Sequence, residues 1–170
     1  MSDNKVVVGV FKTVAQAEVA VSLLHQAGYA REDISAVLPD PAATKNFAYE
    51  QNTKAPEGAV AGGVAGATVG GTIGLLAGIG ALAIPGLGPF IAAGPIMAAL
   101  SGMAAGGAVG GMTGGLVGLG IPELEAKEYE GKIKGGSTLV SVQTTDGKSA
   151  DAAKAIFKNA GVEDVSTKSA

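Results

Sequence analysis

The feature that most constrains this chain is a central block of 65 residues, 58–122, without a single Asp, Glu, Lys, Arg or His. The chain has 28 glycines, and 21 of them lie in this block. All 27 formally charged residues (12 basic and 15 acidic) lie in the other 105 positions, a density typical of a soluble domain. The block must therefore cover its apolar surface with itself, with other copies or with lipid.

The composition argues against several classes of function. A net charge of −3 and an aromatic content of 4% argue against a nucleic-acid binder that relies on a basic surface and base stacking. The chain has no cysteine and one histidine, His25, which we interpret as a partly exposed helix residue. We expect no enzyme, because the sequence offers no catalytic, cofactor-binding or metal-binding residues and no small-molecule substrate is evident.

The charged flanks predict two halves of one small domain. The first half predicts a strand over 6–11, a helix over 14–27 and a strand over 34–38. The second half predicts the same order, with a strand over 137–143, a helix over 149–159 and a strand over 162–167. Thr13 and Ser149 are the expected N-caps of the two helices.

The two halves also resemble each other in sequence. Leu24-His25-Gln26-Ala27-Gly28 and Phe157-Lys158-Asn159-Ala160-Gly161 end the two helices, and each is followed by Glu-Asp, a β-branched apolar residue and Ser. Two βαβ units with right-handed crossovers predict an α+β, ferredoxin-like βαβ-βαβ sandwich with both helices on one face of a four-stranded sheet. The central block enters between the halves and should project from one sheet edge.

Glycine recurs every four residues in the block, at Gly58, Gly62, Gly66, Gly70, Gly74 and Gly78, and again at Gly94, Gly102, Gly106, Gly110, Gly114 and Gly118. On a helix this spacing forms one stripe, which lets two helix backbones pack closely. Between the two series lies a strong turn signal formed by Pro85, Gly86, Gly88 and Pro89. We therefore predict a glycine-zipper helical hairpin rather than a disordered linker or a phosphate-binding loop.

The predicted organisation has four parts: a first half at 1–41, a polar linker at 42–57, the helical hairpin at 58–122, and a connecting helix with the second half at 123–170. The amphipathic connecting helix, expected over 123–134, carries Glu123, Glu125, Glu128 and Glu130. We interpret these glutamates as a solvated face with the pairs Glu123–Lys127 and Glu130–Lys134, rather than as a cation site.

Two kinds of surface can cover the predicted hairpin. Each arm is long enough to cross a hydrocarbon core, so the first expectation is insertion into a lipid bilayer together with self-association. The charged domain would then lie on the cytoplasmic side of the inner membrane under the positive-inside rule, because lysines lie on its side of the hairpin at Lys54, Lys127, Lys132 and Lys134, and residues 1–5 show no export signal. The alternative is a water-soluble cytoplasmic homo-oligomer (a ring, cage or filament) with the hairpins buried copy against copy.

Several motifs spread along nearly the whole chain point to a family. They are Val7-Val8-Gly9-Val10-Phe11, Ala83-Ile84-Pro85-Gly86-Leu87-Gly88-Pro89, Ala92-Ala93-Gly94-Pro95, Gly118-Leu119-Gly120-Ile121-Pro122, Glu125-Ala126-Lys127-Glu128-Tyr129 and Gly135-Gly136-Ser137-Thr138-Leu139-Val140-Ser141-Val142. Together they resemble the bacterial general stress protein family, the heat-induced or low-temperature-induced proteins with a glycine-zipper centre. The resemblance implies a stress-linked, non-enzymatic, membrane-associated protein, and it supplies no catalytic residues.

Overall fold

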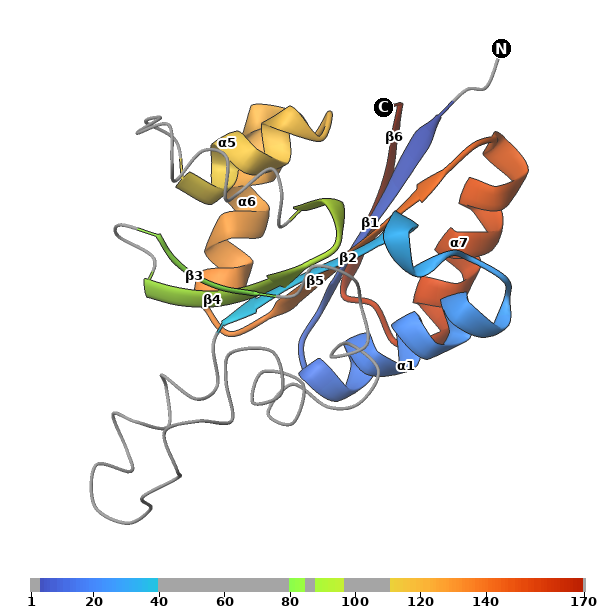
Figure 1. Ribbon diagram of the computed structural model, residues 1–170, viewed down its shortest axis with the longest axis horizontal. Helices are drawn as coiled ribbons and strands as arrows, with labels where there is room; N and C mark the ends of the chain where they lie inside the picture. Colours follow the sequence, from blue (N-terminus) through green and yellow to red (C-terminus); the bar gives the residue numbers. More distant parts are fainter. Residues whose placement is uncertain (1–3, 40–79, 85–87, 97–110, 170) are drawn as a thin grey trace.

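The computed structural model describes residues 4–39, 80–84, 88–96 and 111–169 of the 170-residue chain. The strands are β1 (Lys5–Phe11), β2 (Ile34–Pro39), β3 (Gly80–Ile84), β4 (Gly88–Ala93), β5 (Thr138–Thr144) and β6 (Asp164–Ser169). The helices are α1 (Val14–Gln26), α5 (Gly111–Gly118), α6 (Glu123–Lys134) and α7 (Gly147–Asn159), with a 3-10 turn, η1 (Arg31–Asp33). The strands form one sheet in the order β3-β4-β2-β5-β1-β6, and all neighbours are antiparallel (Figure 1).

The predicted mixture of helices and strands is confirmed, and the elements of the two flanks lie close to their predicted bounds. The helix predicted over 123–134 has the bounds of α6. Thr13 caps α1 as predicted, since its hydroxyl accepts a hydrogen bond from the backbone N–H of Gln16 at 3.2 Å. The N-cap predicted for the last helix is wrong: Asp146 caps α7, and Ser149 donates both its N–H and its hydroxyl to the Asp146 carboxylate, at 2.8 and 2.9 Å.

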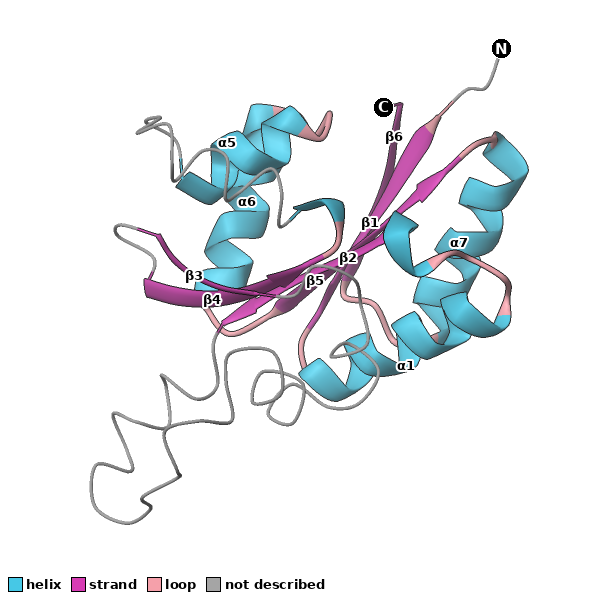
Figure 2. Cartoon of the chain, viewed as in Figure 1, coloured by secondary structure: helices cyan, strands magenta, loops and turns pink. Residues whose placement is uncertain are grey.

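The two predicted helices, α1 and α7, lie on one face of the sheet as expected, and α5 and α6 cover the other face (Figure 2). The buried side chains of α1 and α7 form one core with the strands, and they are Ala17, Ala20, Val21, Leu24, Ala150, Ala153 and Phe157. Those of α5 and α6 form a second core on the other face, and they are Met112, Leu116, Ala126, Tyr129 and Ile133. The uncharged block thus supplies part of the second core through α5.

The strand β1, which lies between β5 and β6, is buried from both sides, and this explains its nearly unbroken run of valines. Val7 and Phe11 belong to the core under α1 and α7, whereas the alternating Val8 belongs to the core under α5 and α6. Gly9 leaves room for Phe157 of α7, because a Cβ on Gly9 would lie 2.7 Å from the Phe157 ring. The α7 helix therefore packs closely against the middle of the sheet.

The sequence repeat between the two halves corresponds to a repeated helix ending. After α1, the N–H of Tyr29 donates to the carbonyl of Leu24, and after α7 the N–H of Val162 donates to the carbonyl of Phe157, each at 3.1 Å. Gly28 and Gly161 have positive φ angles of 94° and 85°, which this type of helix ending requires. Each ending leads the chain back into the sheet, at β2 and β6 respectively.

The helical prediction is wrong for residues 80–84 and 88–93, which form the antiparallel strands β3 and β4. The predicted turn does lie where the chain reverses, because Ile84 pairs with Gly88 across it. β4 continues the sheet beside β2, with Ala36 opposite Ala93 and Pro39 opposite Phe90. Two physical reasons favour strands over a helix here. Without β4, the edge of β2 that faces away from β5 would have no strand to pair with. The prolines at 89 and 95 also oppose a continuous helix.

Candidate functional site

The structure describes three of the twelve predicted packing glycines, and they occupy different environments. Gly94 follows β4, whereas Gly114 and Gly118 lie in α5, which is a helix as predicted. Of the four turn residues, Gly88 and Pro89 begin β4. The following residues lie outside the described part of the chain: Gly58, Gly62, Gly66, Gly70, Gly74, Gly78, Gly102, Gly106, Gly110, Pro85 and Gly86.

Gly94 is a turn residue rather than a member of a helix stripe, which corrects its predicted role. Its φ angle is +80°, and a Cβ at this position would collide with the carbonyl oxygen of Ile34. The turn brings the N–H of Ile96 within 3.3 Å of the Ser35 hydroxyl, to which it donates. Gly94 thus allows the chain leaving β4 to cross closely over the start of β2.

The helix α5 is held by the neighbouring helix α6. Met112 and Leu116 of α5 are fully buried against the sheet. Thr113, in the first turn of α5, donates its backbone N–H to Oε2 of Glu130 at 2.9 Å, and its hydroxyl donates to the same oxygen. Glu130 therefore places a negative charge at the N-terminal end of α5, where the helix dipole favours it. The predicted pair Glu130–Lys134 is wrong, because Glu130 is used as this cap.

A polar cluster joins α6 to the edge strand β6. Tyr129 is almost fully buried, its hydroxyl donates to Oε1 of Glu125, and it lies 2.8 Å from the Ser166 hydroxyl. Lys168 of β6 forms an ion pair with Oε2 of Glu125 at 2.7 Å. A second ion pair, Lys132–Asp164 at 3.1 Å, joins the same two elements. These contacts fix β6 to a helix that packs on the sheet.

The environment of this cluster shifts two pKa values. Burial alone would raise the pKa of Glu125, but hydrogen bonds from Lys168, Ser166 and Tyr129 outweigh it, and the pKa lies below its ordinary value. Burial, and then the hydrogen bond to the Glu125 carboxylate, raise the pKa of the Tyr129 phenol well above its ordinary value of 10. At neutral pH the cluster therefore contains an ionised Glu125 and a protonated Tyr129.

The other predicted features of the connecting helix have mixed outcomes. The predicted ion pair Glu123–Lys127 is present, with a distance of 2.8 Å and both side chains largely exposed. Glu128 pairs with Lys132 at 3.2 Å. Only Glu123 and Glu128 therefore belong to an exposed face, whereas Glu125 and Glu130 bind residues of β6 and α5. The pattern of residues within α6 alone could not indicate these two contacts.

The two edges of the sheet differ in charge. At one edge, β6 contains Asp164 and Lys168, and both are engaged by α6. At the other edge, β3 has the sequence Gly-Ala-Leu-Ala-Ile, without a charged residue or a proline. Among the residues that the structure describes, β3 pairs with β4 alone (Figure 1). Natural proteins usually protect such an edge with charges, prolines or a covering element.

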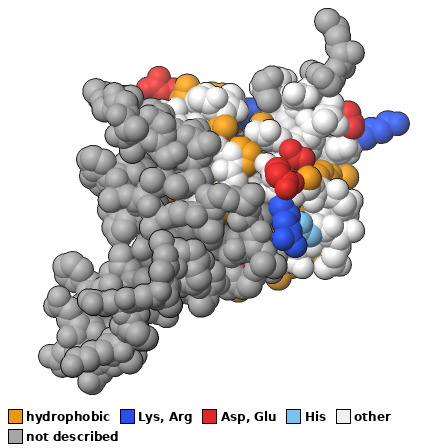
Figure 3. Space-filling model, in the orientation of Figure 1, with side chains coloured by type: hydrophobic (Ala, Val, Ile, Leu, Met, Phe, Trp, Pro, Cys, Tyr) orange, Lys and Arg blue, Asp and Glu red, His pale blue; other side chains and the backbone are white. Residues whose placement is uncertain are grey.

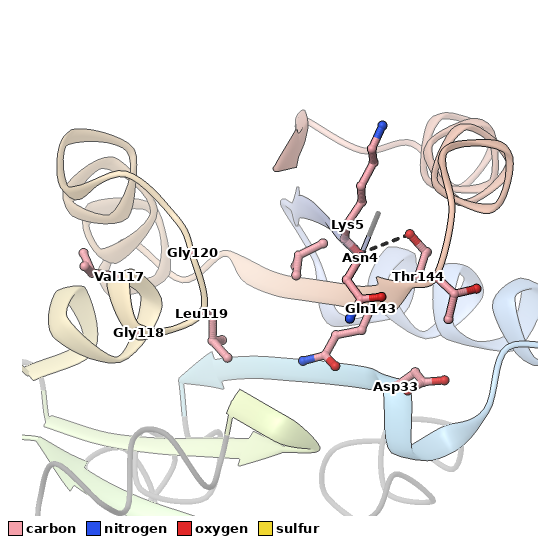
Figure 4. A pocket seen from close by; sticks show the side chains of 11 residues that line it. Asn4, Lys5, Asp33, Val117, Gly118, Leu119, Gly120, Gln143 and Thr144 are labelled. Carbon is pink, nitrogen blue, oxygen red and sulfur yellow. Dashed lines mark hydrogen bonds between the residues drawn. The ribbon is translucent and has the colours of Figure 1, made fainter. Parts of the chain in front are cut away.

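A hollow of about 500 Å³ lies between the C-terminal end of α5 and the adjoining ends of β1 and β5 (Figure 4). Its polar lining includes Asn4, Lys5, Asp33 and Gln143. Thr144 also lines it, but its hydroxyl donates to the carbonyl oxygen of Lys5 at 3.1 Å. The lining thus offers amides and single charges, without a nucleophile next to a histidine.

Metal-ligating side chains do not converge in the described part of the chain. Within residues 4–39, 80–84, 88–96 and 111–169, no three His, Cys, Asp or Glu side chains are arranged to hold a metal ion. On the face visible in Figure 3, acidic and basic side chains of these residues are interspersed rather than gathered into one patch. His25 is partly buried in α1, as predicted.

The search for membrane-spanning helices covers the same residues. None of the helices that the structure describes combines the length and the apolar character needed to cross a bilayer.

Comparisons with known proteins do not assign this chain to a family. It matches no protein-family model, no curated protein and no solved structure.

Proposed function

We propose that this protein is a non-enzymatic, self-associating protein whose uncharged central block supplies the contacts between copies. The observation that carries the proposal is that the described parts of the block gather on one side of the sheet, as the edge hairpin β3–β4 and as α5 (Figure 1). The remaining uncharged segments, 58–79 and 97–110, both adjoin these elements. Uncharged sequence thus continues directly from these elements, and we expect it to supply the apolar surface of an association site.

The anchoring of the block favours contacts between copies over a membrane-spanning hairpin. Segment 97–110 has 14 residues, and its flanking residues Ile96 and Met112 belong to the same core. A crossing helix needs about 20 residues, so this segment is too short to span a bilayer. Segment 58–79 is long enough, but a single crossing would require the charged stretch 40–57 to cross as well, because β2 and β3 belong to one sheet.

A lipid bilayer remains a second candidate partner for the same segments. The observation that favours it is the complete absence of charge over the 22 residues of segment 58–79. If a lipid bilayer is the partner, segment 58–79 lies against the membrane surface without crossing it, and the charged domain stays in the cytoplasm. Such binding rests on buried apolar area and is recognised by co-sedimentation with vesicles.

We also propose a finer description of the fold and of the biological setting. The strands β2, β5, β1 and β6 with α1 and α7 correspond to a ferredoxin-like sandwich, to which β3, β4, α5 and α6 are added.

The motifs that resemble the bacterial general stress proteins favour a role in the stress response.

The experiment that tests self-association compares two leucine substitutions in segment 58–79. Gly70 lies on the glycine stripe, whereas Thr72 lies two residues later, on the opposite side of the predicted helix. Gly70→Leu should lower the molar mass of the particle, measured by light scattering without detergent, because a leucine keeps packed backbones apart. Thr72→Leu should leave the mass unchanged, and equal masses for both variants and the parent protein would contradict the glycine-stripe contact.

A further inference from the structure

We infer that the edge strand β3 pairs antiparallel with β3 of a second copy, so that two six-stranded sheets join into one twelve-stranded sheet across a two-fold axis. This inference deepens the proposed function and rests on it, because it locates one contact between the copies. It needs only the backbone of a strand that the structure describes.

The β3 backbone has hydrogen-bonding groups on both of its sides. In an antiparallel strand, N–H and C=O groups alternate between the two sides, so β4 satisfies only those on its own side. Within the part of the chain that the structure describes, no element pairs with the other side of β3. An edge of this kind is a template for another strand.

The two edge strands of the sheet, β3 and β6, differ in composition. β6 carries Asp164 and Lys168, whose ion pairs with α6 place charge along that edge. β3 carries no charge, so two copies of it can lie side by side around a two-fold axis without like-charge repulsion. The difference predicts association through β3 and none through β6.

The partner strand best matched to β3 is a second copy of β3 itself. The neighbouring uncharged segments of this chain, 58–79 and 97–110, have glycine at nearly every fourth position, and glycine is disfavoured inside strands. β3 itself is the segment that already adopts strand geometry. A second copy of β3 is therefore the best-matched partner, and a two-fold axis makes the contact self-complementary.

A two-fold axis through the middle of β3 fixes the register. Leu82 is the central residue of the five, so it would face Leu82 of the second copy, and Ala81 would face Ala83. Directly opposed residues of antiparallel strands have Cα atoms about 4.5–5.5 Å apart. That separation lies within the range that a disulfide bond can bridge.

Single cysteines test this register, because the natural chain has none. Leu82→Cys should form a disulfide-linked dimer under mild air oxidation. A mixture of Ala81→Cys and Ala83→Cys chains should form the mixed dimer, and these conservative variants give the same test if Leu82→Cys does not fold. The matched control is Ser169→Cys, which places an exposed thiol at the end of the opposite edge strand. It should give about tenfold less dimer.

Light scattering on the parent protein and on the reduced variants separates self-association in general from the pairing of β3. A parent protein that is monomeric at all concentrations would overturn both the proposed self-association and the pairing of β3. A self-associated protein in which cysteines at 81, 82 and 83 cross-link no faster than Ser169→Cys would overturn the pairing of β3 and leave the proposed function standing. A further variant, Leu82→Lys, should weaken dimerisation about tenfold by opposing like charges, whereas Ser169→Lys should not.

Discussion

At the scale of single residues, Gly94 and Gly118 show how differently this chain uses glycine. The backbone of Gly94 has a positive φ and lies against the carbonyl of Ile34, so that only a hydrogen atom fits in the place of a side chain. A Cβ on Gly118, at the end of α5, would meet no atom within 4 Å. Close contact with β2 therefore requires a glycine at position 94, whereas the space around Gly118 would accept a side chain.

This contrast predicts opposite effects of the same substitution. Gly94→Ala should lower the free energy of unfolding by about 2 kcal/mol or more, because it combines an unfavourable φ with a collision against β2. Gly118→Ala should leave it unchanged or raise it by up to about 1 kcal/mol through helix propensity. Urea denaturation measures both, and a Gly94→Ala protein as stable as the parent would show that the turn is not needed.

Glu130 is a second residue whose role depends on a neighbouring helix. Glu130→Ala should destabilise the protein by about 1–2 kcal/mol, because Thr113 loses the acceptor of its backbone N–H at the start of α5. The matched control is Glu128→Ala on the same helix, whose carboxylate pairs only with Lys132 at an exposed position. Hydrogen exchange should show faster exchange in α5 for Glu130→Ala alone, and equal protection in both variants would argue against the cap.

At the scale of elements, β6 is an edge strand secured by side chains. Glu125, Tyr129 and Lys132 of α6 contact Ser166, Lys168 and Asp164 of β6. Ion pairs at partly exposed positions contribute little each, but here they surround a buried phenol that needs hydrogen-bond partners. The cluster therefore holds β6 in register on β1 and leaves this edge unsuited to pairing with another chain.

The lowered pKa of Glu125 makes the stability of the polar cluster between α6 and β6 sensitive to acid. A folded-state pKa below the ordinary value of 4.5 means that the stabilisation is complete above about pH 4.5. It is lost as the pH falls through the folded-state pKa. Glu125→Gln should lower the free energy of unfolding at pH 7 by about 1 kcal/mol and make it less dependent on pH below 4.5. Glu123→Gln should change the free energy of unfolding less. An unchanged pH dependence of the unfolding free energy in Glu125→Gln would contradict the stabilising role of the Glu125 carboxylate in the polar cluster.

The flanking elements could be predicted from the sequence because each has a local signal. β1 shows a run of valines, α1 begins at the cap Thr13, and both α1 and α7 end at a glycine. β3 and β4 carry no such signal, since five or six residues rich in Ala and Gly have neither a helical nor a strand period. Their structure depends on pairing with β2, which is a tertiary interaction.

The candidate site was predictable only in part for the same reason. The charge-free block marks the region that supplies the edge hairpin and α5. The glycine spacing suggested one helical stripe, but Gly94 belongs to a turn, which only the close approach of β2 explains. The roles of Glu125 and Glu130 depend on β6 and α5, so their spacing along α6 could not reveal them.

At the scale of the whole molecule, the protein has two unlike sides. One side carries charged helices and a protected edge, and the other carries the uncharged edge strand β3, which directly follows the uncharged segment 58–79 in the sequence. Such asymmetry suits a protein that joins copies along one side only, which gives closed assemblies when the contact is two-fold.

The most direct test of self-association is the molar mass of the full chain purified without detergent, measured by light scattering over a concentration series, with phospholipid assayed in the same sample. We predict a particle of at least two copies, a mass of about 33 kDa or more from the 16.5 kDa chain, free of phospholipid. A mass of one chain at every concentration, or a particle that forms only with bound lipid, would contradict self-association through the uncharged block.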